Sequence, residues 1–282
     1  MGMIDRDRVE REFIRYTDAY DPSDVKIDLK KRHTFRVAEL SDRIASSLLL
    51  SGDDKDLAWL IGMLHDIGRF EQIRRYQTFR DSISIDHGLL GLRILYDTKD
   101  GSTEEPDVPP EKRFLRRFLD SDNADELIRT AIKNHNCFRV DDSLNTRERM
   151  YCDLIRDADK LDIFRVNCIT PLEEIYDVPL EQVRSMEISD DTMRDFRSGY
   201  TVCRENNHGV ADSIVGHISL IFGLVYPESL TIAREQGYFE QLLDFQFTRP
   251  DSAEKFAEVC QRARAYLLTG DGQNAGDSGS GK

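Results

Sequence analysis

Apolar residues recur every three or four positions along most of the chain, which is the spacing of one face of an α-helix. Alternating segments typical of half-buried strands are scarce. Polar stretches, most of them with glycine or proline, separate the apolar stripes, among them residues 21–23, 51–53, 98–110 and 140–145. The pattern therefore predicts an all-α protein. The clearest stripes are Val9, Phe13, Tyr16 and Tyr20; Val37, Leu40, Ile44 and Leu48; Leu57, Leu60, Ile61 and Leu64; Leu127, Ile128, Ala131 and Ile132; and Leu154, Ile155, Ala158 and Leu161.

The stripes divide the chain into three parts. Residues 1–168 hold the strongest stripes and are predicted to form a helical domain that carries the chemistry. Residues 169–268 are also predicted to be helical, but they show no catalytic signature. We expect them to pack on the first part as additional C-terminal helices or to build a contact between copies of the chain. Residues 269–282 are rich in glycine and serine, so we expect a disordered tail.

Composition excludes several classes of protein. Among 282 residues, 39 Lys and Arg stand against 53 Asp and Glu, a formal net charge of −14 that disfavours binding to a nucleic acid polymer. It leaves room for a small anionic substrate, which responds to local charge. No apolar run is long enough to span a membrane, and the N-terminus lacks the apolar core of a signal peptide. The five cysteines are widely spaced, without CxxC, so we expect reduced thiols and a cytoplasmic location.

Four of the six histidines lie on or beside apolar stripes of the first part, as do two aspartates. If these helices pack with their stripes inward, the six polar groups share one interior, where unpaired charge is costly. A divalent metal satisfies imidazole nitrogens and carboxylate oxygens together, and this donor set suits Mn, Fe, Ni, Co or Zn. We therefore expect one or two metal ions per chain. The candidate ligands are His33, His65, Asp66, His87, His135 and Asp159.

Three strings carry a resemblance to a known family: RHTFRVAEL around His33, GMLHDIGRFEQ around His65 and Asp66, and IRDADKLDIF around Asp159. Their order resembles that of the HD superfamily of metal-dependent phosphohydrolases over about residues 28–165. The resemblance implies an all-helical domain in which His33, His65, Asp66 and Asp159 chelate one divalent metal.

Two further histidines are similar to the extra ligands of HD proteins that bind a second metal, such as the HD-GYP branch and the two-iron oxygenases. They are His87 in IDHGLLGLRIL and His135 in AIKNHN. His87 has an alternative interpretation as a histidine that begins a helix capped by Asp86. His208 and His217 lie in the second part, and we expect them to be ordinary surface or core residues.

The downstream aspartate needs a choice between two candidates. Asp157 and Asp159 are two positions apart, so on a helix they face different directions. Asp159 shares the side of Ile155, and the family resemblance favours the aspartate of ADKL. We therefore take Asp159 as the ligand and Asp157 as a supporting or capping group.

Three residues are candidates for the chemistry itself: Asp66, Arg69 and Glu71. Asp66 is a ligand and, if two metals bind, the expected bridge. Arg69 is the nearest cation in sequence and suits a bidentate phosphate clamp; the alternative is an arginine paired with an acidic residue. Glu71 could orient the attacking water or act as acid or base; the alternative is a helix carboxylate without a catalytic role.

The leading functional hypothesis is a metal-dependent phosphohydrolase that cleaves phosphoester or pyrophosphate bonds of a small phosphorylated molecule, with a nucleotide as the preferred substrate class. The chain lacks the GYP motif, so the substrate of that branch is not transferred. One alternative is a di-iron oxygenase of the HD type. The other is a non-catalytic sensor or scaffold in which the metal staples helices.

Overall fold

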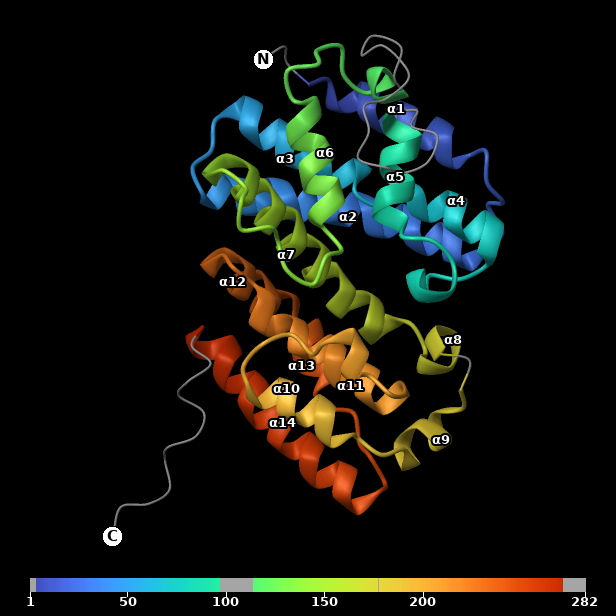
Figure 1. Ribbon diagram of the computed structural model, residues 1–282, viewed down its shortest axis with the longest axis vertical. Coiled ribbons are helices and arrows are strands. Elements are labelled where there is room, and N and C mark those ends of the chain that lie inside the picture. The colour runs from blue at the N-terminus through green and yellow to red at the C-terminus, as the bar shows by residue number, and fades with distance from the viewer. Residues whose placement is uncertain (1–3, 97–113, 177, 271–282) are drawn as a thin grey trace. The chain divides into compact units, whose positions relative to one another are not determined.

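The structure is a computed structural model that describes residues 4–96, 114–176 and 178–270. Within these ranges the chain forms helices and no β-strand, which confirms the all-α prediction (Figure 1). None of these helices combines the length and the apolar character needed to cross a bilayer. The predicted loop at residues 98–110 lies outside the described residues, as do residues 271–282 of the predicted tail.

The chain divides into two compact units, Met1–Ala158 and Asp159–Lys282, here called the N-terminal and C-terminal units. The division falls within helix α7 (Thr146–Ile169), whereas the sequence pattern placed it after residue 168, close to the end of that helix.

All five predicted apolar stripes lie on helices, and the inward residues of these stripes are buried. The first stripe extends beyond its helix, because α1 ends at Thr17 and Tyr20 lies in the following turn. The helices of the N-terminal unit are α1 (Arg6–Thr17), α2 (Val25–Ser47), α3 (Gly52–Leu64), α4 (Ile67–Tyr76), α5 (His87–Tyr96), α6 (Asp125–Asn134) and the first part of α7, with 3-10 turns η1 (Asp81–Ile83) and η3 (Phe114–Arg117).

Side-chain caps fix where the first helices begin. The carboxylate of Asp5 accepts the amide of Arg8 at the start of α1, and Asp24 caps α2 in the same manner. The N-cap of α3 is Ser51, whose hydroxyl accepts the amide of Asp54. Such caps satisfy backbone donors that have no partner inside the helix.

Two glycines allow helices of the N-terminal unit to approach at backbone distance. A Cβ atom on Gly62 of α3 would lie 2.6 Å from the Cα of Ala38 on α2, which packs along α3 (Figure 1). A Cβ atom on Gly68 of α4 would lie 2.2 Å from the carbonyl oxygen of His87, at the start of α5. Only glycine fits at contacts this close. The second contact sets the start of α5 against the start of α4.

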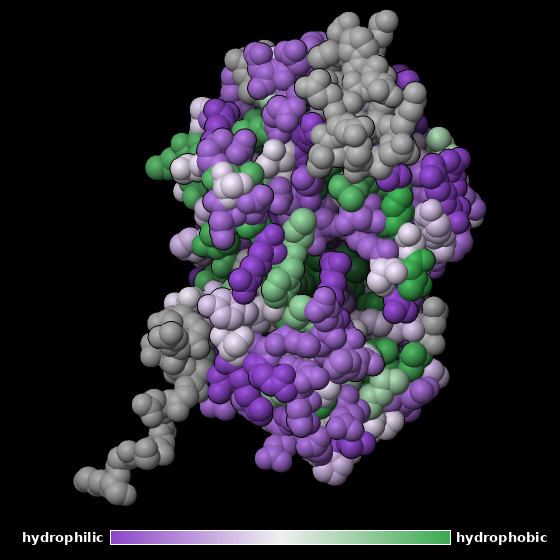
Figure 2. All heavy atoms as spheres, in the orientation of Figure 1, coloured by the Kyte–Doolittle hydropathy of each residue, from purple (hydrophilic) through white to green (hydrophobic). Residues whose placement is uncertain are grey.

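The C-terminal unit contains the end of α7 and a series of shorter helices before the long α14. Phe164 of α7 packs edge-on against Phe239, with ring centroids 4.9 Å apart. The face in view in Figure 2 is mostly hydrophilic. The helices are α8 (Leu172–Tyr176), α9 (Leu180–Ser185), α10 (Asp190–Arg197), α11 (Val210–Ser219), α12 (Pro227–Gln236), α13 (Tyr238–Leu242) and α14 (Pro250–Thr269), with 3-10 turns η4 (Arg204–Asn206) and η5 (Leu220–Gly223).

Candidate metal centre

Helix ends bring most of the candidate ligands together. His33 lies within α2, but His65 is the residue at which α3 ends, and Asp66 is the residue before α4. His87 is the first residue of α5, and His135 follows the last residue of α6. All five side chains are buried. The sequence pattern placed these residues on inward helix faces, whereas the structure assembles most of them where helices begin or end.

The five side chains form two groups that share Asp66. One group is His33, His65 and Asp66, and the other is Asp66, His87 and His135; within each, the potential ligand atoms lie within 4.8 Å of one another. The carboxylate oxygen Oδ2 of Asp66 lies 3.5 Å from His33 Nε2 and 3.6 Å from His65 Nε2. The other oxygen, Oδ1, lies 3.3 Å from His87 Nε2 and 3.8 Å from His135 Nε2. Each oxygen of one carboxylate therefore faces its own pair of imidazoles.

Hydrogen bonds at Nδ1 orient three of the four rings. Nδ1 of His65 lies 2.7 Å from the carbonyl oxygen of Gly62, and Nδ1 of His135 lies 2.6 Å from that of Ile132. Nδ1 of His87 lies 2.7 Å from Asp81 Oδ2. Since carbonyl and carboxylate oxygens only accept, each of these Nδ1 atoms donates, and in the neutral form of the ring Nε2 is the acceptor that faces the centre.

The contact between His87 and His135 suits a bound metal ion. Their Nε2 atoms are 2.9 Å apart, and the Nδ1 hydrogen bonds leave both as acceptors in the neutral rings. Burial lowers the pKa of His87 to about 4, so its ring is neutral near pH 7. Two lone pairs at this distance repel unless a proton or a metal ion lies between them. Imidazole nitrogens with a carboxylate are a ligand set that first-row transition metals accept.

Asp66 is a helix N-cap residue that does not cap its helix. Aspartate at this position usually accepts a backbone amide of the first turn, but the side chain of Asp66 makes no such bond. It instead accepts a hydrogen bond of 2.6 Å from the ammonium of Lys30. Burial acts to raise the pKa of Asp66, but the charge of Lys30 and the neighbouring groups outweigh it and hold the pKa well below its usual range. A buried, ionised carboxylate without a capping role suits a metal bridge.

A second network, of hydrogen bonds around Asp81, positions the ring of His87. Asp81, in η1, accepts from His87 Nδ1 through one oxygen and from Arg69 Nη1, 2.9 Å away, through the other. Gln72 of α4 also donates to Asp81, at 2.8 Å. Burial acts to raise the pKa of Asp81, but the hydrogen bond from His87 and the charge of Arg69 lower it overall. A carboxylate behind a histidine fixes its tautomer and orientation toward a metal.

Arg69 lies beside the metal centre, but its guanidinium group forms several hydrogen bonds with other residues of the chain. Its Nη1 donates to Gln72, to the carbonyl oxygen of Phe79 and to Asp81, while its Nε lies 3.5 Å from Asp66 Oδ1. These contacts favour the interpretation of an arginine paired with acidic residues. The phosphate-clamp role stays a prediction.

Glu71 points to another part of the molecule. One oxygen of its carboxylate accepts from Arg74 and Arg75, and the other lies 3.4 Å from the hydroxyl of Tyr20. The two converging ligand groups do not include it. These contacts match the alternative of a helix carboxylate, and its acid or base role stays a prediction.

The downstream aspartates lie on α7. Asp157 is fully buried and Asp159, the first residue of the C-terminal unit, is half-buried. Neither belongs to the two converging groups found among the described residues. The role of Asp159 as a metal ligand therefore stays a prediction.

Comparison with known proteins agrees with this geometry. Residues 31–164 match the family model described as HD domain, a range that includes His33, Asp66 and Asp159. The chain contains an HD domain. Proteins with this domain are mostly metal-dependent phosphohydrolases, and the domain is an all-α fold, as found here. A comparison with curated proteins and another with solved structures gave no match.

Two residues near the centre were not predicted from the sequence to position it: Lys30, which precedes the matched range, and Asp81. Lys30 lies three positions before His33, which places both residues on one face of a helix. This spacing could have identified Lys30 from the sequence. Asp81 lies in a short irregular segment between α4 and α5, where no periodicity indicates its direction. Its contact with His87 is visible only in three dimensions.

Proposed function

We propose that this HD-domain protein is a metal-dependent phosphohydrolase with a two-metal centre bridged by Asp66. Its substrate is a small molecule with a phosphoester or pyrophosphate bond, and a nucleotide is the class we prefer. The observation that carries the proposal is that both oxygens of one buried carboxylate face separate pairs of histidines. Paired metal sites of this kind suit in-line displacement at phosphorus.

The residues divide the work between two positions. His33, His65 and Asp66, with Asp159, would hold one ion, and Asp66, His87 and His135 would hold the other. When bound, a divalent metal would lower the pKa of a water to near neutrality and neutralise a phosphate oxygen. Asp81 would keep the Nε2 lone pair of His87 pointed at the centre.

Two cations flank the bridging carboxylate. Lys30 donates to Asp66 Oδ2, and Arg69 Nε lies 3.5 Å from Asp66 Oδ1. A phosphate at the centre would offer oxygens to the same ammonium and guanidinium groups, which favour developing negative charge. Lys30 also lies 5.5 Å from the ring centroid of Phe79, which holds its side chain near the centre.

The test is turnover by the full chain loaded separately with Mn, Co, Fe, Zn or Mg, on a panel of nucleotides, phosphomonoesters and pyrophosphate. Asp66→Asn keeps the shape of the side chain and removes the charge, so we expect a loss of about a thousandfold or more in kcat/KM. Asp28→Asn is the matched control, since Asp28 is an exposed α2 residue paired with Arg32. Equal turnover by Asp66→Asn and wild type would contradict the proposal.

A second candidate function rests on the same observation. A centre with two histidine pairs around one carboxylate could also hold two irons for oxygen chemistry. Anaerobic purification followed by iron quantitation separates the two. Two tightly held irons per chain, oxygen uptake and no phosphate release with any metal would favour the oxygenase. Phosphate release with manganese or cobalt in place of iron would favour the hydrolase.

A further inference from the structure

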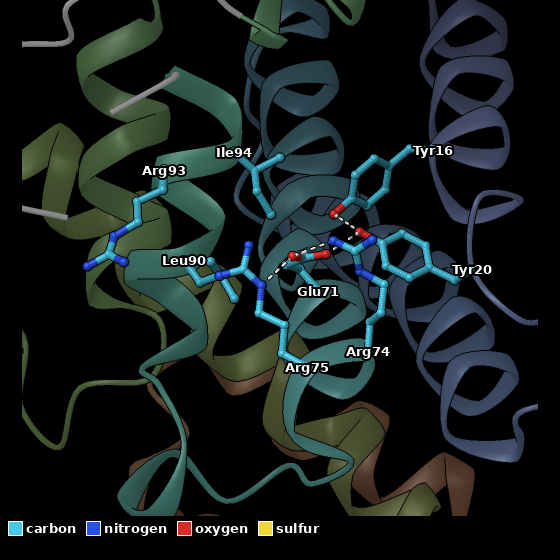
Figure 3. A pocket seen from close by; sticks show the side chains of 8 residues that line it. All are labelled: Tyr16, Tyr20, Glu71, Arg74, Arg75, Leu90, Arg93 and Ile94. Carbon is cyan, nitrogen blue, oxygen red and sulfur yellow. Dashed lines mark hydrogen bonds and ion pairs between the residues drawn. The ribbon is translucent and has the colours of Figure 1, made fainter. Parts of the chain in front are cut away.

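A second concave site lies on α4 and α5, outside the metal centre. This cavity of about 430 Å³ is lined by residues of α4 and α5, by Tyr16 of α1 and by Tyr20, and none of the five clustered metal ligands lines it. Figure 3 shows the guanidinium groups of Arg74 and Arg75 on either side of Glu71, with Arg74 next to Tyr20. The activity proposed above does not use these arginines.

A single buried carboxylate orders the two guanidinium groups. Arg74 Nη2 donates to Glu71 Oε1 at 2.7 Å, and Arg75 Nε donates to the same oxygen. The two arginine side chains are 63 % and 51 % exposed, so each reaches Glu71 from a position in contact with solvent. A guanidinium has five N–H donors in a rigid fork, so one shared carboxylate oxygen leaves the pair able to bind a further anion.

The charge of the lining is positive within an acidic protein. Three arginines, Arg74, Arg75 and Arg93, stand against one carboxylate, that of Glu71, while the whole chain carries a formal charge of −14. Burial raises the pKa of both Tyr16 and Tyr20, so their phenols are neutral near pH 7. The guanidinium of Arg93 lies apart from the other two in Figure 3 and points away from Glu71, so Arg74 and Arg75 are the cations at the centre of the site.

The remaining walls are apolar or aromatic. Leu90 and Ile94 of α5 form one side. Tyr16 and Tyr20 pack edge to face at 5.4 Å and are tied by a hydrogen bond of 2.8 Å between their hydroxyls. The hydroxyl of Tyr16 also donates to the carbonyl oxygen of Ile67, so this wall is anchored to the start of α4. A ring or an apolar group therefore fits beside the anion.

We infer that this cavity is a second ligand site, separate from the metal centre, which binds a small molecule with a phosphate group and a ring. The phosphate binds the forks of Arg74 and Arg75, which match phosphate oxygens bidentately. The ring packs between the tyrosines and Leu90. Because Asp66 directly precedes α4 and His87 begins α5, the ligand binds the same helices that position residues of the metal centre.

The test is calorimetric titration of the metal-free full chain with phenylphosphonate, whose C–P bond a phosphohydrolase does not cleave. Without metal, no ion at the metal centre is present to bind the phosphonate, and variants of Arg74 and Arg75 assign the binding to the cavity, so the result is independent of the proposed activity. We expect one site per chain. Arg74→Gln with Arg75→Gln should weaken binding at least about tenfold, and the charge-matched pair Arg194→Gln with Arg249→Gln, exposed residues of the C-terminal unit, should not.

Glu71→Gln should change the affinity for phenylphosphonate in the opposite direction. It removes the carboxylate that competes for the two arginines, so binding of phenylphosphonate should become several-fold tighter. Arg74→Lys with Arg75→Lys keeps the charge and the partners of Glu71 but loses the forks, and we expect weaker binding in a folded chain. Thermal melting identifies any variant that fails to fold.

Several results would overturn the inference. They are unchanged binding by the Arg74→Gln, Arg75→Gln chain, an equal loss in the Arg194→Gln, Arg249→Gln chain, or no binding by wild type. Benzoate that binds as tightly as phenylphosphonate would overturn the phosphate specificity. Inorganic phosphate that binds as tightly would overturn the role of the apolar wall.

Discussion

The two units of the chain place histidine in contrasting surroundings. In the N-terminal unit, four buried histidines surround one carboxylate, and their ring centroids follow one another at 5.4, 5.3 and 4.9 Å. In the C-terminal unit, His217 faces a single phenol, with its Nδ1 3.0 Å from the hydroxyl of Tyr176. One hydrogen bond satisfies that ring atom, whereas several lone pairs that meet at one point need a cation. Convergence, more than burial, distinguishes a metal centre from a structural histidine.

Substitution of the histidines tests this contrast with the largest effect. His33→Gln and His87→Gln each remove one ligand, so each should weaken binding of one ion at least about a hundredfold and leave the other bound. His217→Gln should leave the metal content unchanged. Metal analysis after dialysis measures this. Full metal content in His33→Gln, or a loss in His217→Gln, would contradict the contrast.

A pair of glycines tests whether helix packing builds the centre. Gly68→Ala places a Cβ within 2.2 Å of the His87 carbonyl oxygen. We therefore expect the free energy of unfolding, measured in urea, to fall by about 3 kcal/mol, with weaker metal binding. Gly216, inside α11, has no atom within 4 Å of a built Cβ. Gly216→Ala should therefore stabilise the chain by about 0.5–1 kcal/mol. Equal effects at the two positions would refute the packing argument.

The support of His87 by Asp81 should be a smaller effect. Asp81→Asn keeps an acceptor for His87 Nδ1 but removes the charge that increases the basicity of the ring. We expect about tenfold weaker binding of the ion at His87 and His135, with the other ion unaffected. Competition with a metal chelator measures the two affinities. Equal weakening of both ions would show that Asp81 acts on the whole fold.

The last prediction concerns pH. Burial lowers the pKa of His217 to about 4, with a smaller contribution from the charge of Arg204, against 6.5 in the unfolded chain. The unfolded state therefore binds the proton first as the pH falls, and stability is lost below pH 6.5. Between about pH 6.5 and 5 this amounts to roughly 1.5 kcal/mol. Urea unfolding of wild type and His217→Asn measures it, and an identical pH dependence would contradict it.

Much of the fold could be predicted from the sequence, because the apolar spacing of an amphipathic helix is visible within a short stretch of residues. The stripes placed α1, α2, α3, α6 and α7, and the HD resemblance identified the histidines and Asp66. The sequence does not indicate in which direction the side chains of an irregular segment point. The contacts of Asp81 with His87 and with Arg69 depend on how the segment between α4 and α5 folds. The pairing of Glu71 with Arg74 and Arg75, at spacings of three and four on α4, was instead a signal present in the sequence. The packing of α4 on α5 depends on a backbone contact at Gly68.

The most direct test of the two-metal account is anomalous diffraction from crystals of the metal-loaded chain, recorded at the absorption edge of the metal. The account predicts two peaks per chain, one beside each oxygen of Asp66, between His33 and His65 and between His87 and His135. A single peak that does not touch Asp66, or no peak among these residues at saturating metal, would contradict it.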